Sequence, residues 1–367
     1  MRTKGRKNFI LRYFRRKGGS IKNAWTKTKA APRNTKEFFK ALPSRARSAT
    51  PYDIKVFLMG HGRMGQGSKR GFIPTLAVYA LAIPFAFVFL YPLFYMVSYS
   101  FMSPSDLVNP LIRYLPTSFY RANFVNAVRV LEFWPALGYS IYIAAMSAVF
   151  QTVAVALVAY GLARYRFPGK KIIFALILIT FLLPVQILIM PQQRMFMSIG
   201  ILHSELAYFV PALFGQGFRS AIFILVFYQF YRAIPKSLEE AAKMDGANAL
   251  MIFIKVSIPL TIPAYLLSFL LSFVWYYNES VLNFMLLGSG SNSILSFGFF
   301  GRGSSTLVAQ LATFRAGIDN VLGAATRDSE AIYMAGAFLC VLPLLILYFF
   351  TQRFFVQGID KSGLTGE

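Results

Sequence analysis

The chain has 367 residues, of which 56% are apolar and only 14% are charged, whereas soluble domains carry about a quarter charged residues. The apolar residues fall in long blocks, which excludes an ordinary soluble protein and predicts an all-α membrane protein. The net charge of +24 is concentrated in residues 1–70, which hold 20 of the 38 Lys and Arg. A basic arm of this kind, followed by apolar blocks, predicts a cytoplasmic tail on a membrane protein. One cysteine, Cys340, excludes an internal disulfide, and two histidines distant in the sequence exclude a zinc site.

Six blocks are long and apolar enough to cross a membrane, since a helical span needs about 20 mainly apolar residues. Lipid offers no partner for free backbone groups, so these blocks are expected to be helices. The fourth block is the weakest, because proline, glycine and Arg219 interrupt it. The blocks run approximately from Pro74 to Tyr99, Leu137 to Ala163, Ile172 to Met190, within Leu206 to Tyr231, from Ile258 to Leu287 and from Ile332 to Phe350.

The lysines predict how the chain is oriented. If the N-terminus is inside, the inner segments are residues 1–71, 164–171, 232–257 and 351–367. All 16 lysines lie in these four segments, and the outer loops contain none. This asymmetry is the positive-inside signal, and it predicts that both termini are cytoplasmic.

Three parts follow from this topology. Residues 1–71 form a basic cytoplasmic and juxtamembrane extension, residues 72–356 form the transmembrane domain, and residues 357–367 form a cytoplasmic tail. The extension is expected to lie on anionic lipid, each basic residue near the surface contributing about 1 kcal/mol. Docking on a cytoplasmic partner is the alternative, and no recognition fold indicates nucleic acid.

The inner loop at residues 232–257 has a clear local pattern. Pro235 is expected to end the incoming helix, and Ser237 with Glu240 has the spacing of a capping box. Strong helix formers follow, and Asp245-Gly246 is a stop and turn signal. The loop is therefore predicted to hold a helix of about two turns on the membrane surface.

This loop resembles a known family. Glu240-Ala241-Ala242, followed by Gly246 and Ile258-Pro259, looks like the EAA signature of ATP-binding-cassette (ABC) importer permeases. The stretch SLEEAAKMDGA is similar to the maltose-type carbohydrate branch, as are AYGLARYRFPGKK (159–171), LLPVQILIMPQ (182–192) and QRFFVQGIDKSG (352–363). The resemblance covers about residues 72–363, and it implies a type I importer permease fold with six transmembrane helices.

In that family the short helix is a coupling helix that docks in a cleft on a cytoplasmic ATPase. The resemblance implies that ATP-driven closure of two ATPases pushes two such helices together and switches the spans between inward-open and outward-open. A purely local role for Glu240, as a cap of its own helix, stays open. The implied coupling residues are Ser237, Glu240, Ala241, Ala242, Asp245, Gly246 and Pro259.

The implied partners are a second permease subunit, two ATPase subunits and an extracellular or periplasmic solute-binding protein. The expected location is the bacterial cytoplasmic (inner) membrane. The chain contains no G-x-x-x-x-G-K-[ST] phosphate loop. It is therefore expected to be no enzyme and to hold no cofactor, with ATP and Mg²⁺ bound by the partner ATPase.

The substrate path is expected among polar residues inside the spans, because such residues are costly in lipid. The family carries Asn followed by Asp or Glu in span five, and Asn278-Glu279 matches this pair, although Ser280 and Val281 replace the aromatics that often follow. A pairing of Glu279 with the partner subunit is the alternative. Arg219 is expected to reach the outer surface or an acidic partner. The candidate path residues are Gln186, Tyr277, Asn278, Glu279 and Asn283.

Several alternatives remain at this stage. The same fold would also suit glycerol phosphate, a polyol or another small solute. An ion-coupled secondary transporter needs no EAA loop, and its carboxylates would lie deep in its spans. A membrane enzyme has no nucleophile–base pair or metal cluster to support it. The aromatic outer loop, with Phe297, Phe299 and Phe300, fits either docking of the binding protein or covering of the mouth between subunits.

Overall fold

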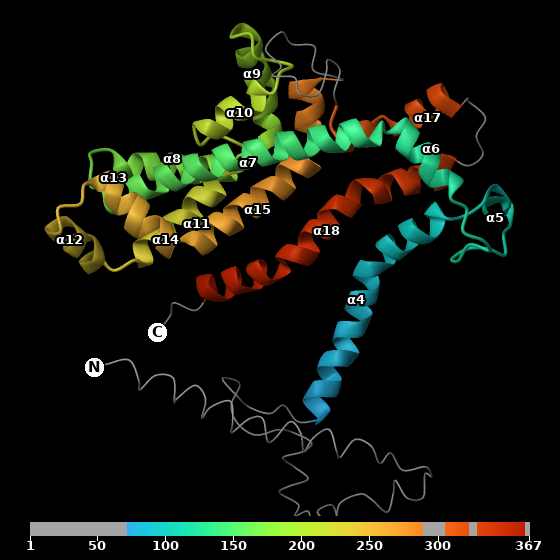
Figure 1. Cartoon of the computed structure of the whole chain (residues 1–367), viewed down its shortest axis with the longest axis horizontal. Coiled ribbons are helices and arrows are strands. Elements are labelled where there is room, and N and C mark those ends of the chain that lie inside the picture. The colour runs from blue at the N-terminus through green and yellow to red at the C-terminus, as the bar shows by residue number, and fades with distance from the viewer. Residues whose placement is uncertain (1–71, 289–304, 323–328, 364–367) are drawn as a thin grey trace, which may run out of the picture. The chain divides into compact units, whose positions relative to one another are not determined.

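The computed structural model describes residues 72–288, 305–322 and 329–363. These residues form α-helices and two short π-helical segments without any strand, which confirms the predicted all-helical class (Figure 1). The basic extension lies outside them. The helices in chain order are α4 (Phe72–Ser100), α5 (Pro104–Val108), α6 (Ala122–Val130), α7 (Phe133–Arg164), α8 (Lys170–Leu182), α9 (Val185–Ser198), α10 (Leu206–Leu213), α11 (Ser220–Ala233), α12 (Lys236–Met244), α13 (Ala249–Ile252), η2 (Phe253–Ser257), α14 (Ile258–Leu260), α15 (Ile262–Asn278), η3 (Asn283–Leu287), α16 (Leu307–Ala312), α17 (Phe314–Leu322) and α18 (Ser329–Gly363).

The contacts within the chain divide it into two units, Met1–Phe89 and Leu90–Glu367. The first unit contributes the N-terminal part of α4 to the described residues. The second unit contains the rest of α4 and all the other helices.

The six apolar blocks correspond to long helices or to broken helix pairs. In the described residues α4, α7 and α18 are each long and apolar enough to cross a membrane. Two more crossings form only if α8 joins α9 and if the helical segment Ala249–Leu260 joins α15. The fourth block contains α10 and the 14-residue α11, with the predicted interruption between them. The last helix, α18, continues to Gly363, beyond the block that predicted it.

The third and fifth blocks are not single helices, which corrects the sequence-based prediction. In the third, α8 ends at Leu182, and both Leu183 and Pro184 have extended backbone before α9 begins. Proline disfavours helical backbone at the preceding residue and has no N–H to continue the hydrogen-bond ladder. In the fifth, the segment before Thr261 is bent by 77° relative to α15, and α15 ends at Asn278.

The core of the second unit is built around α7, which packs against α10, α11 and α15 (Figure 1). Small side chains, including the fully buried Ala148 and Ala156, line this helix and let its neighbours approach closely. Polar contacts fix the register of the helices, since the Gln151 amide donates to the Ser272 hydroxyl at 3.3 Å. Both features are typical of helices that pack inside a membrane.

The segments between α4 and α7 and between α15 and α18 meet near the N-terminal end of α7. The Asn123 amide in α6 donates to the carbonyl groups of Ser100 and Met102 at 3.0 and 2.8 Å. The Leu307 amide in α16 donates to the Ser140 hydroxyl of α7 at 2.7 Å. The central part of the aromatic outer loop, with Phe297, Phe299 and Phe300, lies outside the described residues.

Candidate functional site

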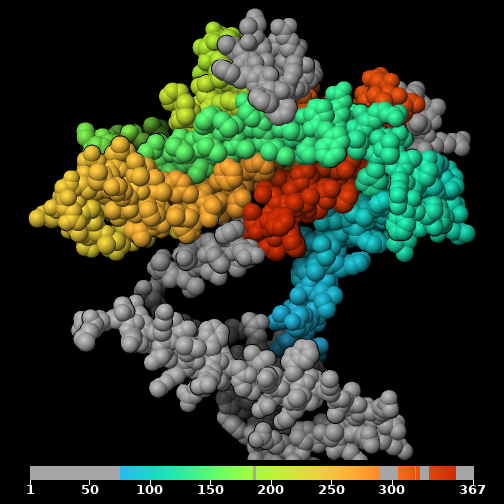
Figure 2. Space-filling view, in the orientation of Figure 1, coloured from blue at the N-terminus to red at the C-terminus, as the bar shows by residue number. Residues whose placement is uncertain are grey.

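The predicted surface helix exists as α12, a nine-residue helix directly after Pro235. It ends in two reverse-turn hydrogen bonds, from Gly246 to the Lys243 carbonyl at 3.0 Å and from Ala247 to the Ala242 carbonyl at 2.9 Å. This pattern requires a left-handed residue, and Gly246 supplies it with a φ of +83°. The space-filling view shows the yellow atoms of α12 at the molecular surface (Figure 2).

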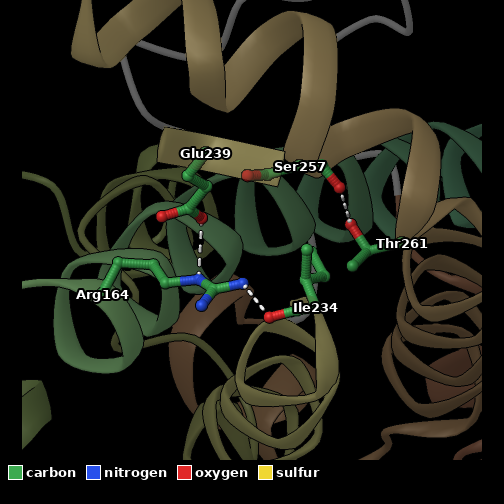
Figure 3. A network of polar contacts seen from close by, with 5 residues as sticks. All are labelled: Arg164, Ile234, Glu239, Ser257 and Thr261. Carbon is green, nitrogen blue, oxygen red and sulfur yellow. Dashed lines mark hydrogen bonds and ion pairs between the residues drawn. The ribbon is translucent and has the colours of Figure 1, made fainter. Parts of the chain in front are cut away.

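An ion pair fastens α12 to the end of α7. The Nε atom of Arg164, the last residue of α7, lies 2.8 Å from the Oε1 atom of Glu239 (Figure 3). A second guanidinium nitrogen of Arg164 donates to the Ile234 carbonyl at 2.8 Å. The two charged side chains are only 6% and 12% exposed. Arg164 therefore holds both α12 and the chain just before it.

The segment that returns to the membrane lies beside this ion pair. Asn248 caps α13 by accepting a hydrogen bond from the Met251 amide at 2.8 Å. The Thr261 hydroxyl donates to the Ser257 carbonyl at 2.7 Å, directly before α15 begins (Figure 3). The loop is thus a sequence of short helices with defined ends.

Six of the seven predicted coupling residues lie on this loop, and Pro259 follows it in α14. The helix itself is confirmed, but the predicted capping box is wrong. Pro235 occupies the N-cap position, no side chain caps the helix, and Ser237 lies inside the first turn. The reason is that Pro235 itself ends the preceding segment in extended backbone, so α12 begins two residues earlier than the Ser237 cap implied. Six of the seven are exposed, and Ala242 is half-buried: the exposed ones are Ser237, Glu240, Ala241, Asp245, Gly246 and Pro259.

Sequence reasoning missed Arg164 and Glu239. Both lay inside stretches that carried the family resemblance, yet nothing in a linear pattern pairs the end of one helix with a distant loop. One signal in the sequence could have indicated the pairing: in a helix, the neighbouring residues Glu239 and Glu240 point to different sides, so only one of them faces solvent fully. A charged residue on the inner side of such a helix requires a partner.

A cavity of about 530 Å³ lies around the break between α10 and α11, at the opposite end of α11 from α12. Its walls come from α8, the first half of α9, α10, the beginning of α11, the end of α15 and η3. Polar side chains among apolar ones line it, a composition that suits binding of a small polar molecule. The polar and charged lining residues include Gln192, Gln216, Arg219, Tyr276 and Glu279.

A buried hydrogen-bond network fixes the turn on which the cavity rests. The Tyr276 hydroxyl of α15 donates to the side-chain oxygen of Gln151 and accepts from the Phe218 amide at 2.9 Å. The Gln151 amide donates to the Phe218 carbonyl at 3.0 Å. Gly217 passes so close that an added Cβ would lie 2.3 Å from the Tyr276 hydroxyl. The position of Arg219 is set by this packed turn.

The structure places the five predicted path residues differently. Glu279 lines the cavity, whereas the exposed Asn278 donates to the Val274 carbonyl at 3.0 Å. Tyr277 is buried and donates to the Cys340 carbonyl at 3.0 Å. Asn283 is also buried, accepting from Tyr208 at 2.5 Å and donating to Thr306 at 2.9 Å. Gln186 belongs to the first turn of α9, and its side chain lies outside the described residues.

Known proteins resemble this chain over most of its length. The arabinooligosaccharides transport system permease protein AraQ of Halalkalibacterium halodurans is 26% identical over 304 residues, which cover 81% of this chain and 100% of that protein. The polygalacturonan/rhamnogalacturonan transport system permease protein YtcP of Bacillus subtilis is 25% identical, covering 79% and 98%. The osmoprotective compounds uptake permease protein GgtD of Synechocystis is 27% identical, covering 66% and 74%.

A solved structure shows the same fold. It is the crystal structure of a bacterial ABC transporter involved in the import of the acidic polysaccharide alginate. A chain of that structure matches with a TM-score of 0.60 and 23% identity, covering 77% of this chain and 96% of that chain.

A family model matches residues 153–361, more than half of the chain, and the match includes α12, Arg164 and the cavity turn. The chain therefore belongs to the family of binding-protein-dependent transport system inner membrane components, the permease subunits of ABC importers.

Proposed function

We propose that this permease forms, with a second permease subunit of different sequence, the path by which a carbohydrate enters the cytoplasm. Alternating access of the two permeases moves the cargo, and two separate ATPase subunits drive the change. The sugar cargoes named for several relatives at about 25% identity support the carbohydrate class. A small polar solute is the second candidate cargo, because one of the relatives is a permease for osmoprotective compounds.

The observation that carries this proposal is the anchoring of α12. Its outer surface, with Glu240, Ala241 and Asp245, is exposed and suits a cleft in another protein. Its inner side is tied to α7 by the buried pair of Glu239 with Arg164. A partner that displaces α12 therefore pulls on the helix at the centre of the transmembrane core.

The remaining parts of the assembly follow from this division of labour. Nucleotide and Mg²⁺ belong to the ATPase subunits, so this chain holds no cofactor of its own. An extracellular or periplasmic binding protein delivers the cargo to the end of α7 that lies opposite α12. We place the chain in the bacterial cytoplasmic membrane with both termini inside, and residues 1–71 on anionic lipid.

The test is a charge exchange across the ion pair in the complete complex, reconstituted in liposomes. Arg164→Gln and Glu239→Gln each leave one buried charge without its partner, which is strongly unfavourable. We expect both variants to assemble with the ATPase but to transport much less cargo per ATP hydrolysed. The double variant Arg164→Glu/Glu239→Arg restores the ion pair but not the hydrogen bond to the Ile234 carbonyl, and is expected to recover part of the coupling.

The chain offers a matched control in its exposed ion pair. Arg315 and Glu330 lie 2.7 Å apart, but their side chains are 70% and 50% exposed. Exposed pairs contribute little, so Arg315→Gln is expected to leave coupling unchanged. Full coupling in Arg164→Gln, or transport by this chain alone in liposomes without any ATPase, would refute the proposal and favour an ion-coupled transporter.

A further inference from the structure

Arg219 carries a charge at the start of α11, at the opposite end of that helix from α12. It immediately precedes α11, whose 14 residues span about 20 Å at 1.5 Å per residue. The other end of α11 leads directly into the surface helix α12. With α11 along the membrane normal and α12 on the membrane surface, Arg219 lies about 20 Å into a hydrocarbon layer that is about 30 Å thick. A charged side chain at such a position marks a pathway or a binding site for a charged group.

No carboxylate within the described part of the chain neutralises Arg219. The ion pairs found there join Arg164 to Glu239 and Arg315 to Glu330. The Arg219 guanidinium instead lies over the rings of Trp275 and Phe218, with its central carbon 4.9 and 5.2 Å from the ring centres. Within the described residues, no ion pair takes up the N–H groups of Arg219, which remain available for a ligand. Those N–H groups match a carboxylate with two parallel hydrogen bonds.

The surroundings of Arg219 suit a sugar ring. Gln192 and Gln216 line the same cavity, and their amides both donate to and accept from hydroxyl groups. Glu279 also lines it, and one of its carboxylate oxygens accepts from the Leu282 amide at 3.1 Å. A ligand that is only an anion would meet repulsion from Glu279, whereas sugar hydroxyls donate to it. The cavity therefore combines one carboxylate-binding group with several hydroxyl-binding groups.

We propose that Arg219 selects an acidic saccharide, a sugar chain bearing carboxylates, by binding one of its carboxylate groups during passage. This rests on the proposed import function and narrows its cargo class. A neutral saccharide has no group that matches the charge of Arg219. The Gln151–Tyr276–Phe218 network holds the turn in place, and the exposed Arg219 side chain lies near the rings of Trp275 and Phe218.

The experiment compares matched cargoes in the reconstituted complex with its own binding protein. The probes are trisaccharides of galacturonate, glucuronate, mannuronate or guluronate, their methyl esters, and neutral trisaccharides of the parent sugars. We expect uptake of at least one acidic probe, with its ester and its neutral counterpart transported at least tenfold more slowly, since each 1.4 kcal/mol corresponds to a factor of ten. Arg219→Gln is expected to remove this preference. Arg219→Lys is expected to keep part of it, because lysine keeps the charge but lacks the paired N–H groups that bind both oxygens of a carboxylate.

Two controls keep the outcomes separate. Arg129→Gln removes an exposed arginine in α6, away from the cavity, and is expected to change nothing. The binding protein is identical in every sample, so a difference between variants arises in the permease.

Equal uptake of acidic and neutral probes, unchanged in Arg219→Gln, overturns the acidic-cargo proposal but leaves the import function intact. Loss of assembly with the second permease in Arg219→Gln also overturns it, because Arg219 then pairs with that subunit. Failure of the wild type to transport any saccharide counts instead against the carbohydrate function.

Discussion

At the scale of single residues, Gly217 shows how closely the cavity turn is packed. A Cβ added there would lie 2.3 Å from the Tyr276 hydroxyl, 2.4 Å from the Gln151 side-chain oxygen and 3.1 Å from the Ala212 Cα. We expect Gly217→Ala to destabilise the protein by about 1–3 kcal/mol, as overpacking does elsewhere. Thermal unfolding in detergent measures this. Gly161→Ala is the matched control, because no atom lies within 4 Å of its added Cβ. Equal melting temperatures for the two variants would contradict the packing argument.

Gly246 is required for a different reason, since its added Cβ has free space but its φ is +83°. A side chain in this left-handed conformation costs about 1–2 kcal/mol, and asparagine tolerates it better than a β-branched residue. We expect Gly246→Val to reach the membrane normally, but the complex that contains it should hydrolyse ATP without uptake, because the end of α12 must rearrange. Gly246→Asn is expected to keep uptake. Measured uptake and ATPase activity decide the matter, and normal uptake in a well-expressed Gly246→Val variant would count against α12 as the coupling element.

The same loop shows where residue-level prediction ends. The sequence pattern predicted the helix, the proline that ends the preceding segment and the glycine stop, because each depends on neighbouring residues. It could not predict that Glu239 rather than Glu240 turns inward to Arg164, because that pairing depends on how α7 ends in space. The predicted N-cap, Ser237, was wrong because α12 begins directly after Pro235, which takes the N-cap position two residues earlier.

At the scale of elements, the short helix α5 contains a carboxylate that makes stability depend on pH. Asp106 is buried and accepts hydrogen bonds from the Thr117 hydroxyl at 2.6 Å and from the Ser103 amide at 3.2 Å. The hydrogen bond from Thr117, helped by those from Ser103, lowers the pKa of Asp106 below its ordinary value of 3.8 despite burial. A lowered folded-state pKa stabilises the protein above the ordinary value, and this contribution is lost as pH falls through the folded-state pKa.

We therefore expect wild type to melt at a higher temperature than Asp106→Asn at pH 7, with a gap that shrinks as pH falls below about 4. Thermal unfolding in detergent across this range measures the gap. Thr117→Val removes the main cause of the shift and should weaken the pH dependence while leaving the carboxylate in place. A gap that stays constant from pH 7 to pH 3 would show that Asp106 acts only through its shape.

Broken helices explain what the apolar blocks did and did not predict. Block length and composition located the three long apolar helices α4, α7 and α18 and the two bent pairs among the described residues, because both follow from the thickness of a bilayer. They could not show that the third segment breaks at Leu183 and Pro184 or that the fifth bends by 77° before α15. Proline marks such breaks, but their geometry depends on the helices packed beside them.

At the scale of the whole molecule, the cavity was the feature least accessible to sequence reasoning. Its lining comes from segments between Ile177 and Leu286 that meet only when α7 brings α10, α11 and α15 together. Glu279 was singled out as a path residue because it is a carboxylate inside an apolar block. Arg219 was expected at the outer surface or beside an acidic partner, because a linear pattern does not show that Trp275 and Phe218 hold it at the cavity.

The orientation of the whole chain gives the last prediction, because the coupling role of α12 requires it to face the cytoplasm. The native Cys340 is buried, at 4% exposed, so the unmodified protein is a low-background reference for thiol labelling. Lys236 in α12 and Asn109 after α5 are both exposed, and α7 lies between them in the chain. Since all the lysines lie in segments of one predicted side, the positive-inside rule places Lys236 inside and Asn109 outside. A membrane-impermeant maleimide should therefore label Asn109→Cys in intact cells, but Lys236→Cys only after permeabilisation. Labelling of Lys236→Cys in intact cells would put α12 beyond the reach of any cytoplasmic ATPase and would refute ATP-driven coupling through it.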